Sequence, residues 1–191
     1  MKKIKFPKTK KIWLNGKLID WEKAEIHILA HALHYGSAVF EGIRVYETKN
    51  GPAVFRLKDH IHRFFNSAKI LKMKFPFSKK EIEEAVLKTV RVNKLNQGYI
   101  RPIAFYGYGK MGLDPQGAPL NIAIICWPWG AYLGKKETIK VKTSAYRRLP
   151  PFSCPMEAKV SGYYVNSILA TFEARDKGYD EALLLDYQNY I

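Results

Sequence analysis

Apolar side chains recur every three or four positions between residues 57 and 71, and this repeat constrains the fold more than any other feature of the sequence. Leu57, Ile61, Phe64, Ala68 and Leu71 would lie on one face of a helix, because an α-helix completes a turn in about 3.6 residues. Such a face has to be buried against another element. The chain is therefore expected to contain an amphipathic helix covered by a sheet or by a second helix.

A second helix is predicted to begin at Ser78. The hydroxyl of Ser78 and the carboxylate of Glu81 form a capping box, in which each side chain satisfies a free backbone N–H group at the helix start. An apolar stripe with helical spacing then runs from Ile82 to Val90. We expect this helix to end between residues 93 and 97.

Runs of apolar and β-branched residues predict strands on both sides of these helices. Asn15-Gly16 is a two-residue turn that favours a β-hairpin between residues 12–14 and 17–19, because both turn positions tolerate positive φ. Strands mixed with helices indicate an α/β (α+β) domain over residues 12–128. The other strands predicted in this domain are residues 39–47, 53–57, 99–106 and 121–127.

Glycine and proline interrupt the pattern after residue 127. We expect an interdomain linker at residues 129–137, and a basic tail at residues 1–11 that precedes the first domain. A second domain would begin at residue 138 and is expected to be incomplete at residue 191, where the pattern stops in a turn. The elements predicted in it are a strand at 138–145, a helix at 162–177 and a strand at 181–186.

The chain carries 32 basic and 17 acidic residues among 191, which gives a net charge of +15. Such a charge suggests a nucleic-acid or anionic-surface function. Six of the lysines, however, lie in the acid-free tail, and the remaining charge is spread thinly. No basic helix and no aromatic-glycine consensus of an RNA-binding sheet accompany it. We therefore expect no nucleic-acid partner and keep a basic nucleic-acid-binding module only as an alternative.

The sequence lacks the features of a membrane-spanning, exported or metal-binding protein. No uncharged apolar run reaches the roughly 20 residues that span a bilayer, and the N-terminus has no apolar core followed by a cleavage site. Cys126 and Cys154 lie far apart, without a Cys-x-x-Cys pair or nearby ligands. The expectations are a cytoplasmic protein with no membrane partner, no disulfide framework and no metal.

Residues 107–112 match the Gly-x-Gly-x-x-Gly spacing of dinucleotide-binding loops. That site needs a helix N-terminus to hold the pyrophosphate, and an acidic residue further along to bind the ribose. Here Pro115, Gly117 and Pro119 follow, and no acidic residue occurs between Asp114 and Glu137. A glycine-rich surface loop is the better interpretation.

Three side chains stand out as candidates for chemistry. Lys159 lies among small and aromatic residues that would leave its amine poorly hydrated, and desolvation favours the neutral amine that Schiff-base chemistry needs. Arg63 lies beside the apolar stripe of the first helix and is suited to bind an anion, although a surface pair with Asp59 is the simpler interpretation. Arg101 shares a strand face with Tyr99 and suggests a carboxylate clamp, unless its stem only stacks at a sheet edge.

Taken together, the motifs resemble those of the branched-chain amino-acid aminotransferases, members of the pyridoxal-phosphate (PLP) enzymes of fold type IV. The likeness covers essentially everything after the tail, and its most specific parts are the HYGSAVFEGIR and PWGAYLG segments. The matching stretches are residues 12–16, 31–44, 60–69, 99–102, 128–134 and 159–164.

The resemblance implies PLP as the cofactor and a two-domain fold with a small α/β domain followed by a larger barrel-like domain. Lys159 would be the Schiff-base lysine and the catalytic base. Arg63 would bind the cofactor phosphate, and Tyr164 would hydrogen-bond the 3-oxygen of the pyridoxal ring.

The substrate site is also implied by the resemblance. Arg101, helped by Tyr35 and Tyr132, would take the distal carboxylate of glutamate. The loop at residues 111–113 would reach the site of a neighbouring subunit in a homodimer or a higher homo-oligomer. The residues expected to line the side-chain pocket are Tyr35, Phe40, Trp129 and Tyr164.

The implied activity is transamination between leucine, isoleucine or valine and 2-oxoglutarate, giving branched-chain 2-oxo acids and L-glutamate by ping-pong kinetics. The partners would be small amino acids and 2-oxo acids. Sister enzymes with the same lysine, D-amino-acid aminotransferase and aminodeoxychorismate lyase, are the alternatives. The sequence departs from the family at its end, because the glutamate that pairs with the pyridine nitrogen lies beyond residue 191 in family members. The chain is therefore expected to be a fragment that is inactive alone.

Overall fold

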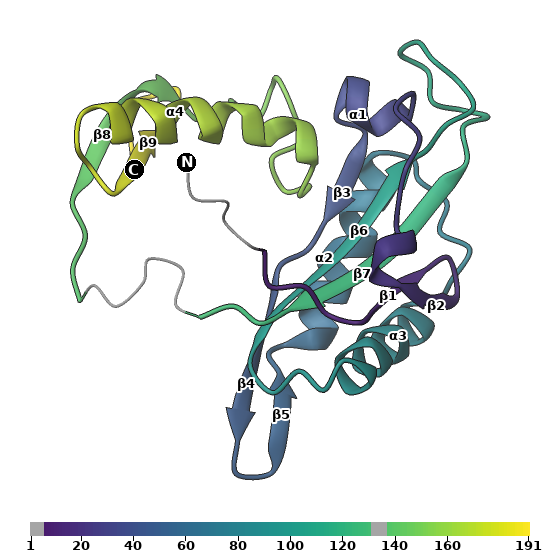
Figure 1. Cartoon of the computed structure of the whole chain (residues 1–191). Helices are drawn as coiled ribbons and strands as arrows, with labels where there is room; N and C mark the ends of the chain where they lie inside the picture. The colour runs from purple at the N-terminus through teal and green to yellow at the C-terminus, as the bar shows by residue number, and fades with distance from the viewer. Residues whose placement is uncertain (1–5, 131–136) are drawn as a thin grey trace.

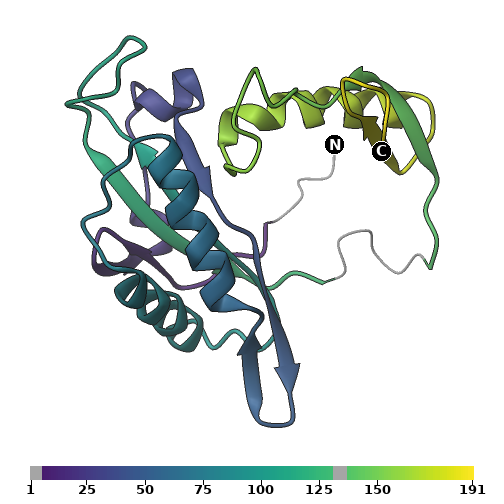
Figure 2. The same cartoon turned by 180° about the vertical axis from the view of Figure 1, so that it is seen from behind.

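A computed structural model describes residues 6–130 and 137–191. The first of these ranges forms a seven-stranded sheet with two helices packed on one of its faces, as Figure 1 and the reverse view in Figure 2 show. The second range forms a two-stranded parallel sheet with one long helix against it.

The large sheet is antiparallel throughout, with the strand order β2-β1-β7-β6-β4-β5 and with β3 paired to β6. Its longest pairing joins β6 to β7 over eight residue pairs, from Tyr99–Trp127 to Tyr106–Leu120. Its strands are β1 (Lys11–Leu14), β2 (Lys17–Asp20), β3 (Ala38–Phe40), β4 (Ile43–Thr48), β5 (Gly51–Val54), β6 (Gly98–Tyr106) and β7 (Leu120–Trp127).

The two predicted helices are confirmed as α2 (Leu57–Ile70) and α3 (Lys79–Val92). Their apolar stripes are buried against the sheet, with Ile61, Phe64, Ile82 and Val86 fully inaccessible to solvent. The capping box at the start of α3 is present in both directions. The structure adds two short helices that the periodicity did not predict, the 3-10 turn η1 (Trp21–Lys23) and α1 (His31–Tyr35).

The strand predicted at residues 39–47 is interrupted at Glu41 and Gly42. The backbone N–H of Glu41 still donates to the carbonyl of Pro102 at 2.8 Å, so the chain stays attached to β6. A side chain at position 42 would collide with the Tyr99 hydroxyl, because an added Cβ would lie 1.8 Å from that oxygen. The strand predicted at residues 53–57 also ends early, since Arg56 adopts a left-handed conformation (φ 45°) and α2 begins at the next residue.

In the second part, β8 (Val141–Arg147) and β9 (Glu181–Leu185) flank the helix α4 (Tyr164–Asp176), which is preceded by the 3-10 turn η2 (Ser161–Tyr163). The strand-helix-strand order confirms the elements predicted there. Backbone hydrogen bonds also tie this part to the first, from the N–H of Phe40 to the carbonyl of Lys159 and from the N–H of Gly162 to the carbonyl of Gly36. No helix within the described residues is long and apolar enough to cross a membrane.

Glu173 ties α4 to β8. Its carboxylate accepts from the Ser144 hydroxyl at 2.6 Å and from the backbone N–H of Ala145 at 2.9 Å, and Lys177 and Lys142 lie 3.4 and 3.5 Å away. These hydrogen bonds, Ser144 first, lower the pKa of Glu173 to about 2. The folded state therefore gains stability above the ordinary carboxyl pKa of 4.5 and loses it as the pH falls from there towards 2.

We expect Glu173→Gln to remove part of this pH dependence. Urea midpoints measured at pH 6 and at pH 3 should differ less in the variant than in the wild type, because the variant has no carboxylate to protonate there. Glu84→Gln, on the exposed face of α3, is the control and should keep the wild-type difference. An unchanged pH dependence in Glu173→Gln would contradict the role given to this carboxylate.

Candidate active site

Lys159 is fixed by contacts with the first part of the chain. Its backbone N–H donates to the hydroxyl of Ser67, a fully buried residue of α2, at 3.0 Å. Its carbonyl accepts from the N–H of Phe40, and the next residue, Val160, forms a β-bridge with Val39. The segment that carries Lys159 is thus attached to the edge of β3, which sets the direction in which its side chain leaves the backbone.

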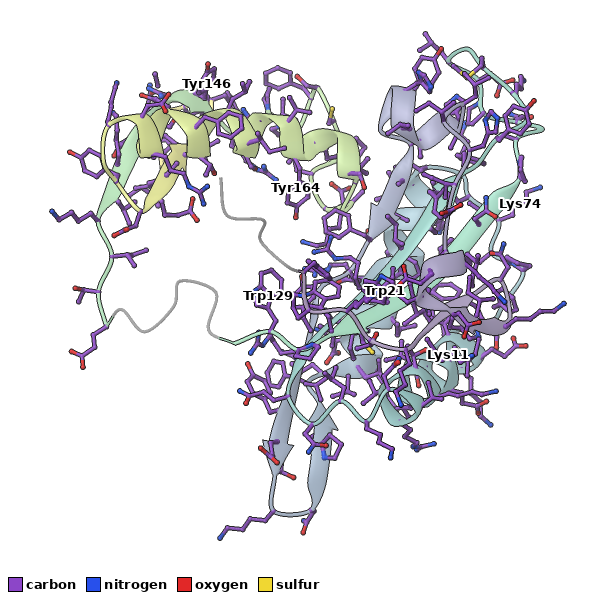
Figure 3. All side chains as sticks on the ribbon, in the orientation of Figure 1. Lys11, Trp21, Lys74, Trp129, Tyr146 and Tyr164 are labelled. Atoms are coloured by element: carbon purple, nitrogen blue, oxygen red, sulfur yellow. The ribbon has the colours of Figure 1, made fainter. Side chains whose placement is uncertain are left out.

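The amine of Lys159 meets a phenol and two aromatic rings. Its Nζ donates to the Tyr164 hydroxyl at 2.7 Å. It also lies 5.0 Å from the centre of the Phe40 ring and 5.3 Å from that of Tyr164, and these two rings are 5.0 Å apart. Tyr164 opens α4, so the one turn η2 between positions 159 and 164 brings the two polar groups together. Figure 3 shows Tyr164 on the side of α4 that faces the large sheet.

These groups line a cavity of about 340 Å³ between the two parts of the chain. Figure 3 shows that Trp129, which follows β7, belongs to the large-sheet side, whereas Tyr164 comes from the helix α4. A cavity with aromatic walls and a few polar groups is the usual form of a small-molecule site. The lining residues are Phe40, Arg44, Tyr99, Arg101, Trp129, Lys159 and Tyr164.

The guanidinium of Arg101 lines this cavity, and not all of its N–H groups have a hydrogen-bond partner among the described residues. Its guanidinium carbon lies 4.5 Å from the Phe40 ring centre and 5.3 Å from that of Tyr99, and Nη2 donates to the Tyr99 hydroxyl at 3.4 Å. Its Nε is buried without a hydrogen-bond partner among the described residues. A buried unpaired donor is uncommon in a native protein, so this guanidinium has hydrogen-bonding capacity that the described residues do not use. The arrangement suits a carboxylate.

A second hollow of about 200 Å³ shares Lys159 and Tyr164 with the first cavity. Two guanidinium groups, those of Arg63 and Arg148, contribute to its wall together with Glu157. Cations converging on one side of an amine suit an anionic group such as a phosphate.

Arg63 is held by a carboxylate that the sequence did not single out. Glu41, which is fully buried, accepts from Arg63 Nε at 2.5 Å and from Nη2 at 2.7 Å, and His60 Nδ1 lies 2.9 Å from the same carboxylate. The alternative pair between Arg63 and Asp59 is wrong, because Asp59 pairs with Arg56 instead.

The structure brings five of the predicted site residues into one cavity: Phe40, Arg101, Trp129, Lys159 and Tyr164. Arg63 lines the adjoining hollow. Tyr132 falls outside the described residues. Arg44, Tyr99 and Arg148 also line these spaces but were not selected from the sequence. Alternation along β6 placed Tyr99 beside Arg101, whereas no periodic signal marked Arg148 in its irregular segment.

Tyr35 differs from the expectation, since it does not line this chain's cavity. It lies on α1 with 42% of its surface exposed, and its hydroxyl accepts from the backbone N–H of Gly112 at 3.2 Å. The buried His31 holds the same loop, because its Nε2 lies 2.7 Å from the Gly112 carbonyl. The reason for the difference is that α1 packs against the connection between β6 and β7. No helix begins at residues 107–119, so the glycine-rich segment is a surface loop, as predicted.

Comparisons with known proteins identify the family to which the chain is similar. Residues 38–191 match the family model described as amino-transferase class IV. A branched-chain-amino-acid aminotransferase of Pseudomonas aeruginosa is 45% identical over 183 residues, which are 94% of this chain and 60% of that protein. The chain thus spans about 60% of the length of the curated relatives it matches.

Solved structures of similar proteins superpose over nearly the whole chain. The crystal structure of the Escherichia coli branched-chain amino acid aminotransferase has a TM-score of 0.92 at 42% identity, and covers 95% of this chain and 61% of its own. The T.th. branched-chain amino acid aminotransferase complexed with N-(5'-phosphopyridoxyl)-L-glutamate has a TM-score of 0.88 at 46% identity, with 96% and 60% covered.

Proposed function

The chain belongs to the class IV aminotransferases and has the predicted type IV fold, and from this premise we propose that it binds PLP covalently at Lys159 and transfers amino groups between branched-chain L-amino acids and 2-oxoglutarate. The observation that carries the proposal is the amine of Lys159, 2.7 Å from the Tyr164 hydroxyl, in a cavity that also holds the incompletely paired Arg101. The similar T.th. enzyme was solved with a phosphopyridoxyl-glutamate adduct.

The residues around Lys159 fit a ring that carries an aldehyde, a hydroxyl and a phosphate. PLP, when bound, supplies an aldehyde that takes up the amino group and a conjugated ring that accepts the electron pair left by the Cα proton. Lys159 would hold the aldehyde, Tyr164 would donate a hydrogen bond to the ring oxygen, and Arg63 and Arg148 would bind the phosphate from the adjoining hollow.

Lys159 has two tasks in this proposal. Its Nζ would hold the cofactor until the substrate amine takes its place, and the freed Nζ would then take the Cα proton and later give it back. Because Tyr164 is within hydrogen-bond distance of the same nitrogen, the amine stays near the reacting carbon after its release. The rings of Phe40, Tyr164 and Trp129 line the cavity and would contact the apolar side chain of a branched-chain substrate.

One cavity has to accept leucine-like and acidic side chains in turn. The aromatic wall suits the first, and Arg101, with Tyr132 and the Tyr35 of a neighbouring copy as the further proposed contacts, suits the distal carboxylate of glutamate. The two half-reactions share a site, so ping-pong kinetics belongs to the proposal.

We expect Arg101→Met to separate these two substrates. The KM for glutamate and for 2-oxoglutarate should rise about 10- to 100-fold, the range expected for losing a charge-assisted hydrogen bond, while the KM for leucine changes little. Arg91→Met, on the exposed end of α3, is the matched control and should leave both values unchanged. Equal losses for glutamate and leucine would show that Arg101 only supports the cavity wall.

A homodimer is part of the same proposal. The loop at residues 107–119 and the helix α1 expose apolar side chains, among them Leu33, Tyr108 and Leu113. Tyr35 bonds to this loop and not to its own cavity, so we assign Tyr35 and residues 111–113 to the site of a neighbouring copy. The division into residues 1–11, 12–128, 129–137 and 138–191 and the cytoplasmic location are proposals too.

A substrate panel tests the reaction. The protein is incubated with PLP and then with L-leucine, D-alanine or aminodeoxychorismate, and the 2-oxo acid or pyruvate formed is measured. Formation of 4-methyl-2-oxopentanoate from L-leucine supports the proposal. Product from D-alanine or aminodeoxychorismate alone would assign a sister activity, and salt-sensitive RNA or DNA binding that persists without PLP would indicate a nucleic-acid-binding protein.

A further inference from the structure

The one fully buried carboxylate among the described residues belongs to Glu41, and it lies at the break between β3 and β4. Every contact on it comes from a donor. Oε1 accepts from Arg63 Nε, while Oε2 accepts from Arg63 Nη2 and from the backbone N–H of Gly42 at 3.2 Å, with His60 Nδ1 at 2.9 Å. Burial raises the pKa of Glu41, but the bonds from Arg63 and His60 outweigh it and keep the pKa below its ordinary value.

The strand is interrupted so that this side chain can turn towards α2. His60 and Arg63 lie three residues apart on α2 and therefore share a face of that helix. The side chain of His60 is 21% exposed and that of Arg63 is 50% exposed, so the carboxylate is enclosed while the guanidinium reaches open space. A buried charge is costly unless it is fully paired, and both oxygens of the Glu41 carboxylate are paired here.

The contact is made along one edge of the guanidinium. Arginine has five N–H groups, and Glu41 takes one on Nε and one on Nη2, which leaves three. Arg63 lines the hollow that also contains Lys159 and Tyr164. Two parallel bonds fix the plane of a guanidinium, which a single bond or a lysine cannot do.

We propose that Glu41 is a positioning residue, whose carboxylate fixes the Arg63 guanidinium so that its free N–H groups face the phosphate end of the cofactor site. This inference rests on the proposed function, in which Arg63 binds that phosphate. The inference predicts that phosphate binding depends more on the orientation of the Arg63 guanidinium than on the net charge around it. Glu41 lowers the net positive charge near the phosphate, so a purely electrostatic role would make its removal strengthen phosphate binding.

The test compares capture of PLP with capture of pyridoxal, which has the same aldehyde but no phosphate. The 191-residue protein is titrated with each compound, reduced with borohydride and analysed for label at Lys159. The ratio of the two half-saturating concentrations measures the preference for the phosphate. Because both compounds bind the same folded protein, a loss of stability alone does not change this ratio.

Glu41→Gln removes the charge and one of the two acceptors, and Glu41→Asp keeps the charge but shortens the reach. Both variants should lower the preference for PLP about tenfold, the loss expected for a misdirected charge-assisted bond. Glu47→Gln, on the exposed end of β4, should keep the wild-type ratio. A Glu41→Gln variant with an unchanged or higher preference would overturn the inference.

Two further variants at Arg63 complete the test. Arg63→Lys leaves a cation beside Glu41 but cannot be held along an edge, so a lowered preference in it supports the inference even if the Glu41 variants do not fold. A wild-type ratio in Arg63→Lys would contradict it. Arg63→Gln tests the underlying assignment. If it keeps the preference, or if the wild type captures no PLP at Lys159, the proposed function fails as well, whereas failure confined to the Glu41 variants leaves that function standing.

Discussion

Lys159→Ala is expected to abolish covalent capture of PLP and to lower amino transfer about 10³-fold or more. The side chain is proposed both to hold the aldehyde and to carry the Cα proton, and loss of a positioned general base alone accounts for a factor of this order. No other lysine of the described residues lines the cavity with Phe40, Arg101 and Tyr164.

Capture and turnover are measured separately for this variant. Capture is followed by the visible absorbance of PLP mixed with the protein and by mass after borohydride reduction, and turnover by the 2-oxo acid formed from L-leucine. Lys80→Ala, at an exposed position of α3, should behave as the wild type in both. Retained turnover in Lys159→Ala with bound cofactor would remove the lysine from the mechanism.

Gly36→Ala is expected to have the largest effect on the structure around the site. Gly36 ends α1 in a left-handed conformation (φ 64°), and a Cβ there would lie 2.7 Å from Cα and 3.1 Å from N of Gly162. Backbone atoms cannot move aside as a side-chain end does. The left-handed conformation and the overlap together should lower the free energy of unfolding by about 3 kcal/mol.

The same contact offers its own control. A Cβ at Gly162 would meet Gly36 atoms no closer than 3.5 Å, which is an ordinary van der Waals distance. Gly162→Ala should therefore change stability by less than about 1 kcal/mol. The turn η2 lies between Lys159 and Tyr164, so Gly36→Ala should also weaken PLP capture. Equal urea midpoints and equal capture in the two variants would show that the close approach of the backbones is unimportant.

Local signals were sufficient for most of the fold. The helices α2 and α3 follow from apolar spacing and from a capping box, which depend on residues a few positions apart. The break at Glu41 could not be predicted in this way. Its partners His60 and Arg63 are 19 and 22 positions away in the sequence, and only the packed structure brings them to one carboxylate. Alternation along the strand gave no reason to end it there.

The sequence predicted only those site residues that lie in segments with a recognisable motif. Phe40, Arg101, Trp129, Lys159 and Tyr164 belong to segments with a specific family resemblance, and they meet in one cavity. Tyr35 belongs to such a segment too, but it does not line this cavity, because its hydroxyl accepts from the backbone N–H of Gly112 instead. Arg148 was overlooked because its irregular segment has no periodicity, and Glu41 because a buried carboxylate is recognised only through its donors.

The covalent bond between PLP and one lysine tests the central claim most directly. The protein is incubated with PLP, reduced with borohydride, digested and mapped by mass spectrometry, with Lys159→Ala treated in parallel. We predict a phosphopyridoxyl label on the peptide containing Lys159, saturating at one group per chain and absent from the variant. An unmodified Lys159, or label spread equally over exposed lysines in both proteins, would contradict the assignment of this site.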